Sequence, residues 1–127
     1  MVILNVDDDE DDRKIFVDAI KEINPSIICL TAGNAIEAQS LWSRVANIPQ
    51  LDFIFLDINM PKMNGIELLE VLKKDNRFEQ VPIYMLSTSC SEADISYITS
   101  LGSKYIAKQS RFVDTITGLS SIIYPTH

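Results

Sequence analysis

Residues 53–60 read FIFLDINM, and this stretch decides the fold because its apolar run stops abruptly at Asp57. Four successive apolar residues, Phe53–Leu56, indicate a strand that is covered on both faces, as in a parallel sheet. A turn-rich segment at residues 59–65 follows, and residues 66–74 then show the periodicity of a helix. A buried strand that leads into a helix is the repeating unit of an α/β fold.

The same alternation recurs on both sides of this stretch. The predicted strands are Val2–Val6, Ile27–Leu30, Phe53–Leu56, Val81–Leu86 and Tyr105–Ala107. The predicted helices are residues 11–23 with Ile15 on the inward face, residues 35–46, residues 66–74, a helix capped by Ser91 and ended by Gly102, and a last helix with Phe112, Ile116, Leu119 and Ile123 inward. Strands joined by helices run parallel, so we expect a doubly wound five-stranded sheet with helices on both faces. The sequence shows no linker or repeat, so we expect residues 1–127 to form a single domain.

Composition and charge narrow the class of protein. The chain has 127 residues, is 46% hydrophobic and carries a net charge of −7, because 18 acidic residues outnumber 11 basic ones. Such a balance argues against direct binding of nucleic acid. The chain has no apolar run of membrane-spanning length and no basic start typical of a signal peptide, so we expect a cytoplasmic protein without membrane insertion. The two cysteines and one histidine form no zinc-site or Cys–His pattern.

Polar side chains follow four of the five predicted strands. Asp7 and Asp8 follow the first strand, Asp57 the third, Ser87 and Thr88 the fourth, and Lys108 the fifth. In an open parallel sheet, ligands bind beyond the carboxyl ends of the strands. One edge of the sheet is therefore expected to carry three carboxylates, a pair of hydroxyl groups and a lysine.

Carboxylates gathered at one edge either raise each other's pKa or recruit a cation. A donor set of oxygen atoms without Cys or His suits Mg²⁺ or Mn²⁺. Lys108 adds a second positive charge, so the site is suited to a phosphoryl group held beside a carboxylate. An aspartate can itself be the nucleophile that accepts such a group, as an aspartyl phosphate.

Four stretches resemble the receiver domains of two-component response regulators, and the resemblance covers essentially the whole chain. They are VDDD at residues 6–9, LDINMP at 56–61 with Asn64-Gly65, MLST at 85–88 and YIAK at 105–108. The resemblance is to stand-alone, chemotaxis-regulator-like members. It implies a flavodoxin-like three-layer sandwich with strand order 2-1-3-4-5. In that order Asp57 would lie about 5 Å from the ends of the first and fourth strands, and Lys108 would start about 10 Å away.

The resemblance also implies a role for each site residue. Asp57 would accept the phosphoryl group, and Asp8 and Asp57 would bind the metal directly, with Asp7 acting mainly through water. The other implied roles are the Asn59 backbone carbonyl as a metal ligand, Ser87 and Lys108 as partners of phosphoryl oxygens, and Tyr105 as an aromatic switch that follows Ser87. A slip of one residue would make Asp9 a ligand, and Thr88 is a rival for the role of Ser87. We interpret Asp9–Asp12 as a solvated acidic helix start, which the helix dipole favours.

The implied function is that of a single-domain response regulator. A histidine kinase or histidine phosphotransfer protein would donate the phosphoryl group to Asp57 with Mg²⁺ bound, and the domain would catalyse its own phosphorylation and dephosphorylation rather than act as an enzyme on other substrates. Phosphorylation would switch a face made of the fourth helix, fifth strand and last helix toward an unidentified downstream protein. Because the chain ends after the last helix, we expect no attached DNA-binding domain.

One departure from the family pattern supports an alternative. The family usually has a proline in a cis peptide after the lysine, whereas Gln109 stands here, and a cis bond before a non-proline residue costs about 2.5–4 kcal/mol. The alternative is an interaction module with a receiver fold but no phosphate-dependent switching.

A Mg²⁺-dependent phosphatase is a third hypothesis, although such enzymes usually place an acid where Asn59 stands. The resemblance also implies that the positions of Asn59 and Ser89 tune the lifetime of the aspartyl phosphate. Neither residue is a carboxylate that could orient a water for hydrolysis, so we expect an intermediate or long lifetime.

Overall fold

The computed structural model describes residues 1–44, 51–60 and 62–125. Within them, strands and helices alternate along the chain as predicted. The strands are β1 (Val2–Val6), β2 (Ile28–Ala32), β3 (Phe53–Asp57), β4 (Ile83–Ser87) and β5 (Lys104–Ala107). The helices are α1 (Glu10–Ile23), α2 (Ala35–Arg44), α3 (Gly65–Lys73), α4 (Glu92–Ser100) and α5 (Phe112–Ile123), with a short 3-10 helix η1 (Asn76–Phe78) before β4.

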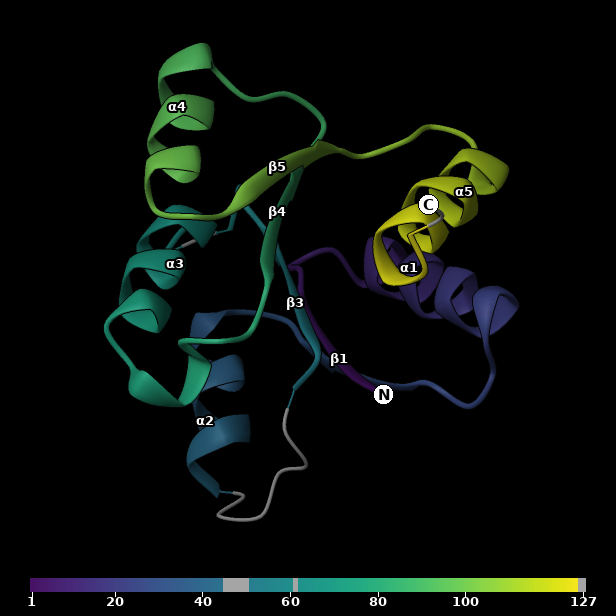
Figure 1. The fold of residues 1–127 in the computed structure, drawn as a ribbon, viewed down its shortest axis with the longest axis horizontal. Helices are drawn as coiled ribbons and strands as arrows, with labels where there is room; N and C mark the ends of the chain where they lie inside the picture. Colours follow the sequence, from purple (N-terminus) through teal and green to yellow (C-terminus); the bar gives the residue numbers. More distant parts are fainter. Residues whose placement is uncertain (45–50, 61, 126–127) are drawn as a thin grey trace.

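The strands form one parallel sheet in the order β2-β1-β3-β4-β5. Figure 1 shows α1 and α5 side by side on one face of the sheet and α2, α3 and α4 on the other. This arrangement confirms the predicted doubly wound sheet and its three layers. Because β3 is central, Asp57 at its end lies between the ends of β1 and β4. In the pairing of β3 with β4, Asp57 is in register with Leu86.

Two hydrophobic clusters hold the helices on the sheet. In β1 the side chains alternate, so that Leu4 belongs to the cluster beneath α2, α3 and α4 while Ile3 belongs to the cluster beneath α1 and α5. Phe55 of β3 packs on Phe16 of α1 with ring centroids 5.1 Å apart. Burial of both faces explains the uninterrupted apolar run at Phe53–Leu56.

Side-chain caps mark the start of α1, α3 and α4. Asp9 precedes α1 and accepts the Asp12 N–H at 3.0 Å. Asn64 and Glu67 form a reciprocal capping box at the start of α3. Ser91 caps α4 as predicted, and Gly102 follows that helix with a φ of 82°, which favours glycine.

The prediction that Ile15 and Phe112 face inward is wrong. Ile15 is 45% exposed, and Phe112 is 43% exposed, while the buried positions of α5 lie later in the helix at Leu119 and Ile123. Periodicity identifies the apolar side of a helix but not how far along it the neighbouring layer reaches. Residues 45 and 46 of the predicted second helix, and Pro61, lie outside the described residues. None of the described helices combines the length and apolar character that a membrane span needs.

Candidate functional site

Three carboxylates gather at the carboxyl edge of the sheet. Asp7 and Asp8 follow β1, Asp57 ends β3, and one oxygen from each lies within 4.8 Å of the others. Asp7 and Asp57 are only 2% and 4% exposed, whereas Asp8 is exposed to solvent. The sheet order therefore brings together residues that are about 50 positions apart in the sequence, as predicted from the strand ends.

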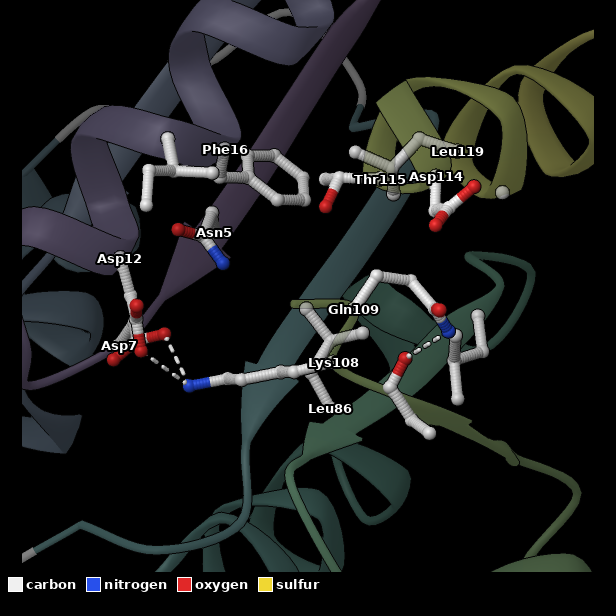
Figure 2. Close-up of a pocket in the computed structure, with 14 residues that line it drawn as sticks. Asn5, Asp7, Asp12, Phe16, Leu86, Lys108, Gln109, Asp114, Thr115 and Leu119 are labelled. Atoms are coloured by element: carbon white, nitrogen blue, oxygen red, sulfur yellow. Dashed lines mark hydrogen bonds and ion pairs between the residues drawn. The ribbon is translucent and has the colours of Figure 1, made fainter. Parts of the chain in front are cut away.

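Lys108 reaches this cluster from the end of β5. Its Nζ lies 2.9 Å from Asp7 Oδ2 and 3.5 Å from Asp57 Oδ1. Figure 2 shows the extended side chain pointing back from the loop after β5 toward the carboxylates. No peptide bond among the described residues is cis, so Gln109 follows Lys108 through a trans peptide. The trans path still places the ammonium group beside Asp57.

Asp12 is a third partner of Lys108, and the interpretation of Asp12 as a merely solvated helix residue is wrong. Its Oδ2 lies 3.0 Å from Lys108 Nζ, and its side chain is 39% exposed (Figure 2). Asp12 lies in the first turn of α1, which points at the same edge of the sheet. The acidic run carried no signal that separated Asp12 from Glu10 and Asp11, because the choice depends on how α1 is rotated.

Burial and charge shift the pKa values of the two central groups. Burial raises the pKa of Asp57 to about 7, and the charge of Asp7 adds to this rise while Lys108 opposes it. Burial by itself lowers the pKa of Lys108, but hydrogen bonds to Asp7 and Asp12 outweigh it, so that the lysine pKa is raised. Lys108 therefore stays protonated and charged. The positive charge near Asp57 is too small to keep the pKa of this carboxyl group at its ordinary value.

Ser87 and Asn59 are hydrogen-bonded to each other beside Asp57. Ser87 is fully buried; its Oγ accepts from Asn59 Nδ2 at 3.0 Å and donates to the Ser89 carbonyl at 2.6 Å. Thr88, its predicted rival, is exposed. The Asn59 backbone N–H faces Asp57 Oδ1 at 3.4 Å. Tyr105 is half-buried, and its hydroxyl donates to the Ser87 carbonyl at 3.1 Å.

Two further residues shape the site: Gly65, which the sequence motif includes without indicating its contact with Asp57, and Arg13, which sequence reasoning missed. A Cβ on Gly65 would lie 2.2 Å from the Asp57 carbonyl oxygen, so only glycine fits at the start of α3. The Gly65 N–H also donates to the Ile58 carbonyl at 2.9 Å. On the other side, Arg13 Nη1 donates to the Asp7 carbonyl at 2.7 Å. The Asn64-Gly65 pair did signal a turn, but not its contact with the Asp57 backbone.

The cluster has the chemistry of a site for a hard divalent cation. Its side-chain donors are carboxylate oxygens from Asp7, Asp8 and Asp57, with no sulfur or imidazole among them. Asp9 lies next to them in sequence but uses its side chain to cap α1. Asp7 and Asp57 are buried beside a third carboxylate, so their negative charges repel one another. The charge of Lys108 offsets this repulsion only in part, and a bound cation would offset more of it.

Comparison with known proteins decides the family. The sequence model of the response regulator receiver domain matches residues 3–118. The chain belongs to this family. Receiver domains are phosphoacceptors in two-component signalling, and this one is similar to chemotaxis regulators of the CheY type.

Individual relatives agree with this assignment. The receiver domain is 30% identical over 109 residues to chemotaxis protein CheY1 of Helicobacter pylori strain J99, which covers 85% of each chain. Its fold matches the Mn²⁺-bound form of response regulator Rcp1 with a TM-score of 0.84 at 25% identity, covering 99% of this chain and 96% of that one. The phosphorylated cyanobacterial phytochrome response regulator RcpA matches with a TM-score of 0.84 at 28% identity, covering 95% and 89%.

Proposed function

We propose that this receiver domain is a single-domain response regulator that accepts a phosphoryl group on Asp57 from a histidine kinase or a histidine phosphotransfer protein. The observation that carries the proposal is the position of Asp57. Its carboxylate lies within 4.8 Å of those of Asp7 and Asp8 and 3.5 Å from the Lys108 ammonium. The match to RcpA, a protein described in its phosphorylated form, supports the same reading.

The side chains around Asp57 have distinct roles in this proposal. An Asp57 carboxylate oxygen attacks phosphorus, the bond between phosphorus and the donor histidine nitrogen breaks, and an acyl phosphate forms. Lys108 then pairs with one phosphoryl oxygen. Ser87 exchanges its bond to the Ser89 carbonyl for a bond to another. Tyr105, which now donates to the Ser87 carbonyl, changes rotamer as that segment moves.

Mg²⁺ is the cofactor we propose, with Mn²⁺ as a substitute. Asp8 and Asp57 would hold it directly, Asp7 through water, and the Asn59 carbonyl would complete the protein ligands. The metal would supply the positive charge that keeps Asp57 ionised and offsets charge on the phosphoryl oxygens. The Mn²⁺-bound form of Rcp1 supports a divalent metal in a relative of this fold.

The output of the switch would be a change of the α4, β5 and α5 face. Tyr105 lies on β5, and its hydrogen bond to the Ser87 carbonyl connects this face to the site. A downstream protein that prefers the phosphorylated state would shift the equilibrium toward that state.

Intact-mass measurement tests the proposal. With acetyl phosphate and Mg²⁺, the protein should gain a single phosphoryl group, and EDTA should prevent this. Asp57→Asn should abolish the gain, whereas Asp18→Asn, which changes an exposed carboxylate of α1, should leave it intact. A phosphoryl group mapped to any residue other than Asp57 would contradict the proposal.

The alternative of an interaction module keeps one supporting observation, because Gln109 replaces the family's proline and its peptide bond is trans. Beryllofluoride, which mimics the phosphoryl group, separates the two functions. A phospho-switch should show Mg²⁺-dependent shifts of amide resonances in α4, β5 and α5, whereas a module should show none. A phosphatase would instead release many phosphates per protein molecule.

A further inference from the structure

Asp12 is, within the part of the chain that the structure describes, the one ion-pair partner of Lys108 that lies outside the cluster of Asp7, Asp8 and Asp57. Its Oδ2 lies 3.0 Å from Lys108 Nζ, almost as close as Asp7 Oδ2 at 2.9 Å and closer than Asp57 Oδ1 at 3.5 Å. Figure 2 shows the lysine side chain extended toward both Asp7 and Asp12. The ammonium group therefore donates to these two carboxylates and lies farther from Asp57.

With a cation in the cluster, Asp12 would be the carboxylate that remains available to the lysine. Asp7 and Asp57 belong to the oxygen donors proposed to hold Mg²⁺, so a bound cation would compete with Lys108 for their negative charge. Asp12 takes no part in that donor set. Its bond to Lys108 is therefore the contact that a phosphoryl oxygen would have to replace.

The first turn of α1 is fixed to the end of β1, which limits how far Asp12 can move. Arg13 Nη1 donates to the Asp7 carbonyl at 2.7 Å, and the Asp9 N–H donates to Asp7 Oδ1 at 2.9 Å. The Asp9 side chain in turn accepts the Asp12 N–H at 3.0 Å. A short side chain on a fixed backbone has only a few rotamers, so a lysine that moves toward Asp57 leaves Asp12 behind.

The backbone of Lys108 is fixed on the other side of Asp57. Its N–H donates to the Ser87 carbonyl, at the end of β4, at 2.8 Å. Because β1 and β4 flank β3, the Asp12–Lys108 pair connects the two sides of the strand that ends at Asp57. The ammonium group lies on a flexible four-carbon side chain, so it can change partner while both backbones stay in place.

Solvent exposure limits the strength of this pair. The Asp12 side chain is 39% exposed and that of Lys108 is 19% exposed, so water weakens their attraction. Ion pairs of this kind change an equilibrium constant by a factor of roughly two to five. A contact of this strength can slow a reaction at the site without preventing it.

We propose that Asp12 is an autoinhibitory residue that acts through Lys108. In the unphosphorylated protein Asp12 retains the ammonium group at the start of α1, and the lysine passes from Asp12 to a phosphoryl oxygen when Asp57 is phosphorylated. The contact thereby lowers the rate of phosphorylation. The transfer of the lysine rests on the proposed function, whereas the pair itself does not.

The ¹⁵N signal of the Lys108 ammonium group in the full chain tests the pair and its exchange. In EDTA without a phosphodonor, Asp12→Asn should shift this signal, and Asp11→Asn, which removes a neighbouring exposed charge, should shift it much less. With Mg²⁺ and beryllofluoride, the difference between wild type and Asp12→Asn should shrink to that seen for Asp11→Asn. An unshifted signal in metal-free Asp12→Asn would overturn the pair, and an undiminished difference with beryllofluoride would overturn the transfer of the lysine.

The initial rate of phosphorylation by acetyl phosphate and Mg²⁺, followed by intact mass, tests the inhibition. Asp12→Asn should react roughly two to five times faster than the wild type, and Asp11→Asn should react at the wild-type rate. An equal or slower rate in Asp12→Asn would overturn the inhibition. If the wild type neither binds beryllofluoride nor gains a phosphoryl group, the proposed function fails together with the lysine transfer, while the metal-free signal still decides the pair.

Discussion

Lys108 is the side chain on which the electrostatics of the site depend. Its ammonium group lies within 3.5 Å of carboxylate oxygens from Asp7, Asp12 and Asp57. Two of these carboxylates belong to the cluster of Asp7, Asp8 and Asp57, while Asp12 lies outside it. If Asp57 carries the proposed phosphoryl group, Asp12 would compete with that group for the lysine.

Removing this competition should strengthen binding of a phosphoryl mimic. We expect Asp12→Asn to raise the affinity for beryllofluoride in the presence of Mg²⁺ by roughly two- to fivefold, the value of a partly exposed ion pair. Calorimetric titration measures this change. Asp11→Asn removes a neighbouring exposed charge and is the matched control. A lower affinity in Asp12→Asn would mean that Asp12 positions the lysine rather than competing for it.

The raised pKa of Asp57 predicts a pH dependence of stability in the metal-free protein. The ordinary pKa is 3.8, and the folded-state pKa is about 7. As the pH rises between these values, the unfolded chain loses this proton while the folded chain keeps it, so the folded state loses stability. The loss is absent below the lower value and complete above the higher one.

The comparison with Asp57→Asn isolates this effect, because asparagine does not titrate. In EDTA, the free energy of unfolding of the wild type minus that of the variant should fall from about pH 4 to about pH 7 and then level off. Urea denaturation at a series of pH values measures it. A difference that rises with pH would show that Asp57 is a stronger acid in the folded protein.

The start of α3 packs directly against the backbone of the site. Its first residue, Gly65, packs against the backbone of Asp57 and Ile58, and the Asn64–Glu67 capping box fixes where the helix begins. The helix start therefore helps to define the backbone path directly after Asp57.

Two alanine substitutions at glycines in helices should have opposite effects. Gly65→Ala places a Cβ 2.2 Å from the Asp57 carbonyl oxygen and should destabilise the fold by about 1–3 kcal/mol. Gly118→Ala meets no atom within 4 Å and should stabilise it by about 0.5–1 kcal/mol through helix propensity. Urea denaturation measures both. Similar effects of the two substitutions would disprove the close approach of Gly65 to β3.

The complete sheet would couple the proposed metal binding to folding. The carboxylate cluster exists only when β1 and β3 are paired, so a cation that binds it stabilises the folded state alone. Mg²⁺ at 100 times its dissociation constant should raise the free energy of unfolding by about 2.7 kcal/mol. The effect should be largely lost in Asp8→Asn and retained in Asp11→Asn, as thermal unfolding can measure. Equal stabilisation of both variants would place the cation elsewhere.

Much of the fold and of the site could be predicted from local sequence features. The apolar run at Phe53–Leu56 indicates a buried parallel strand, and the polar residues that follow the strands indicate one reactive edge. Asp7, Asp8, Asp57 and Lys108 all lie there in the structure. These predictions succeed because strand ends and apolar runs are properties of short segments, and a parallel sheet aligns all its carboxyl ends. The order of the strands came from family resemblance.

Other features depend on contacts between distant segments. The Asp12–Lys108 pair joins residues 96 positions apart, and the approach of Gly65 to Asp57, the exposure of Phe112 and the unpaired oxygen of Asn5 have no counterpart in periodicity. Each depends on how a helix is rotated and how far it extends along the sheet. Packing of whole layers decides this, because every side chain must fit its neighbours at once.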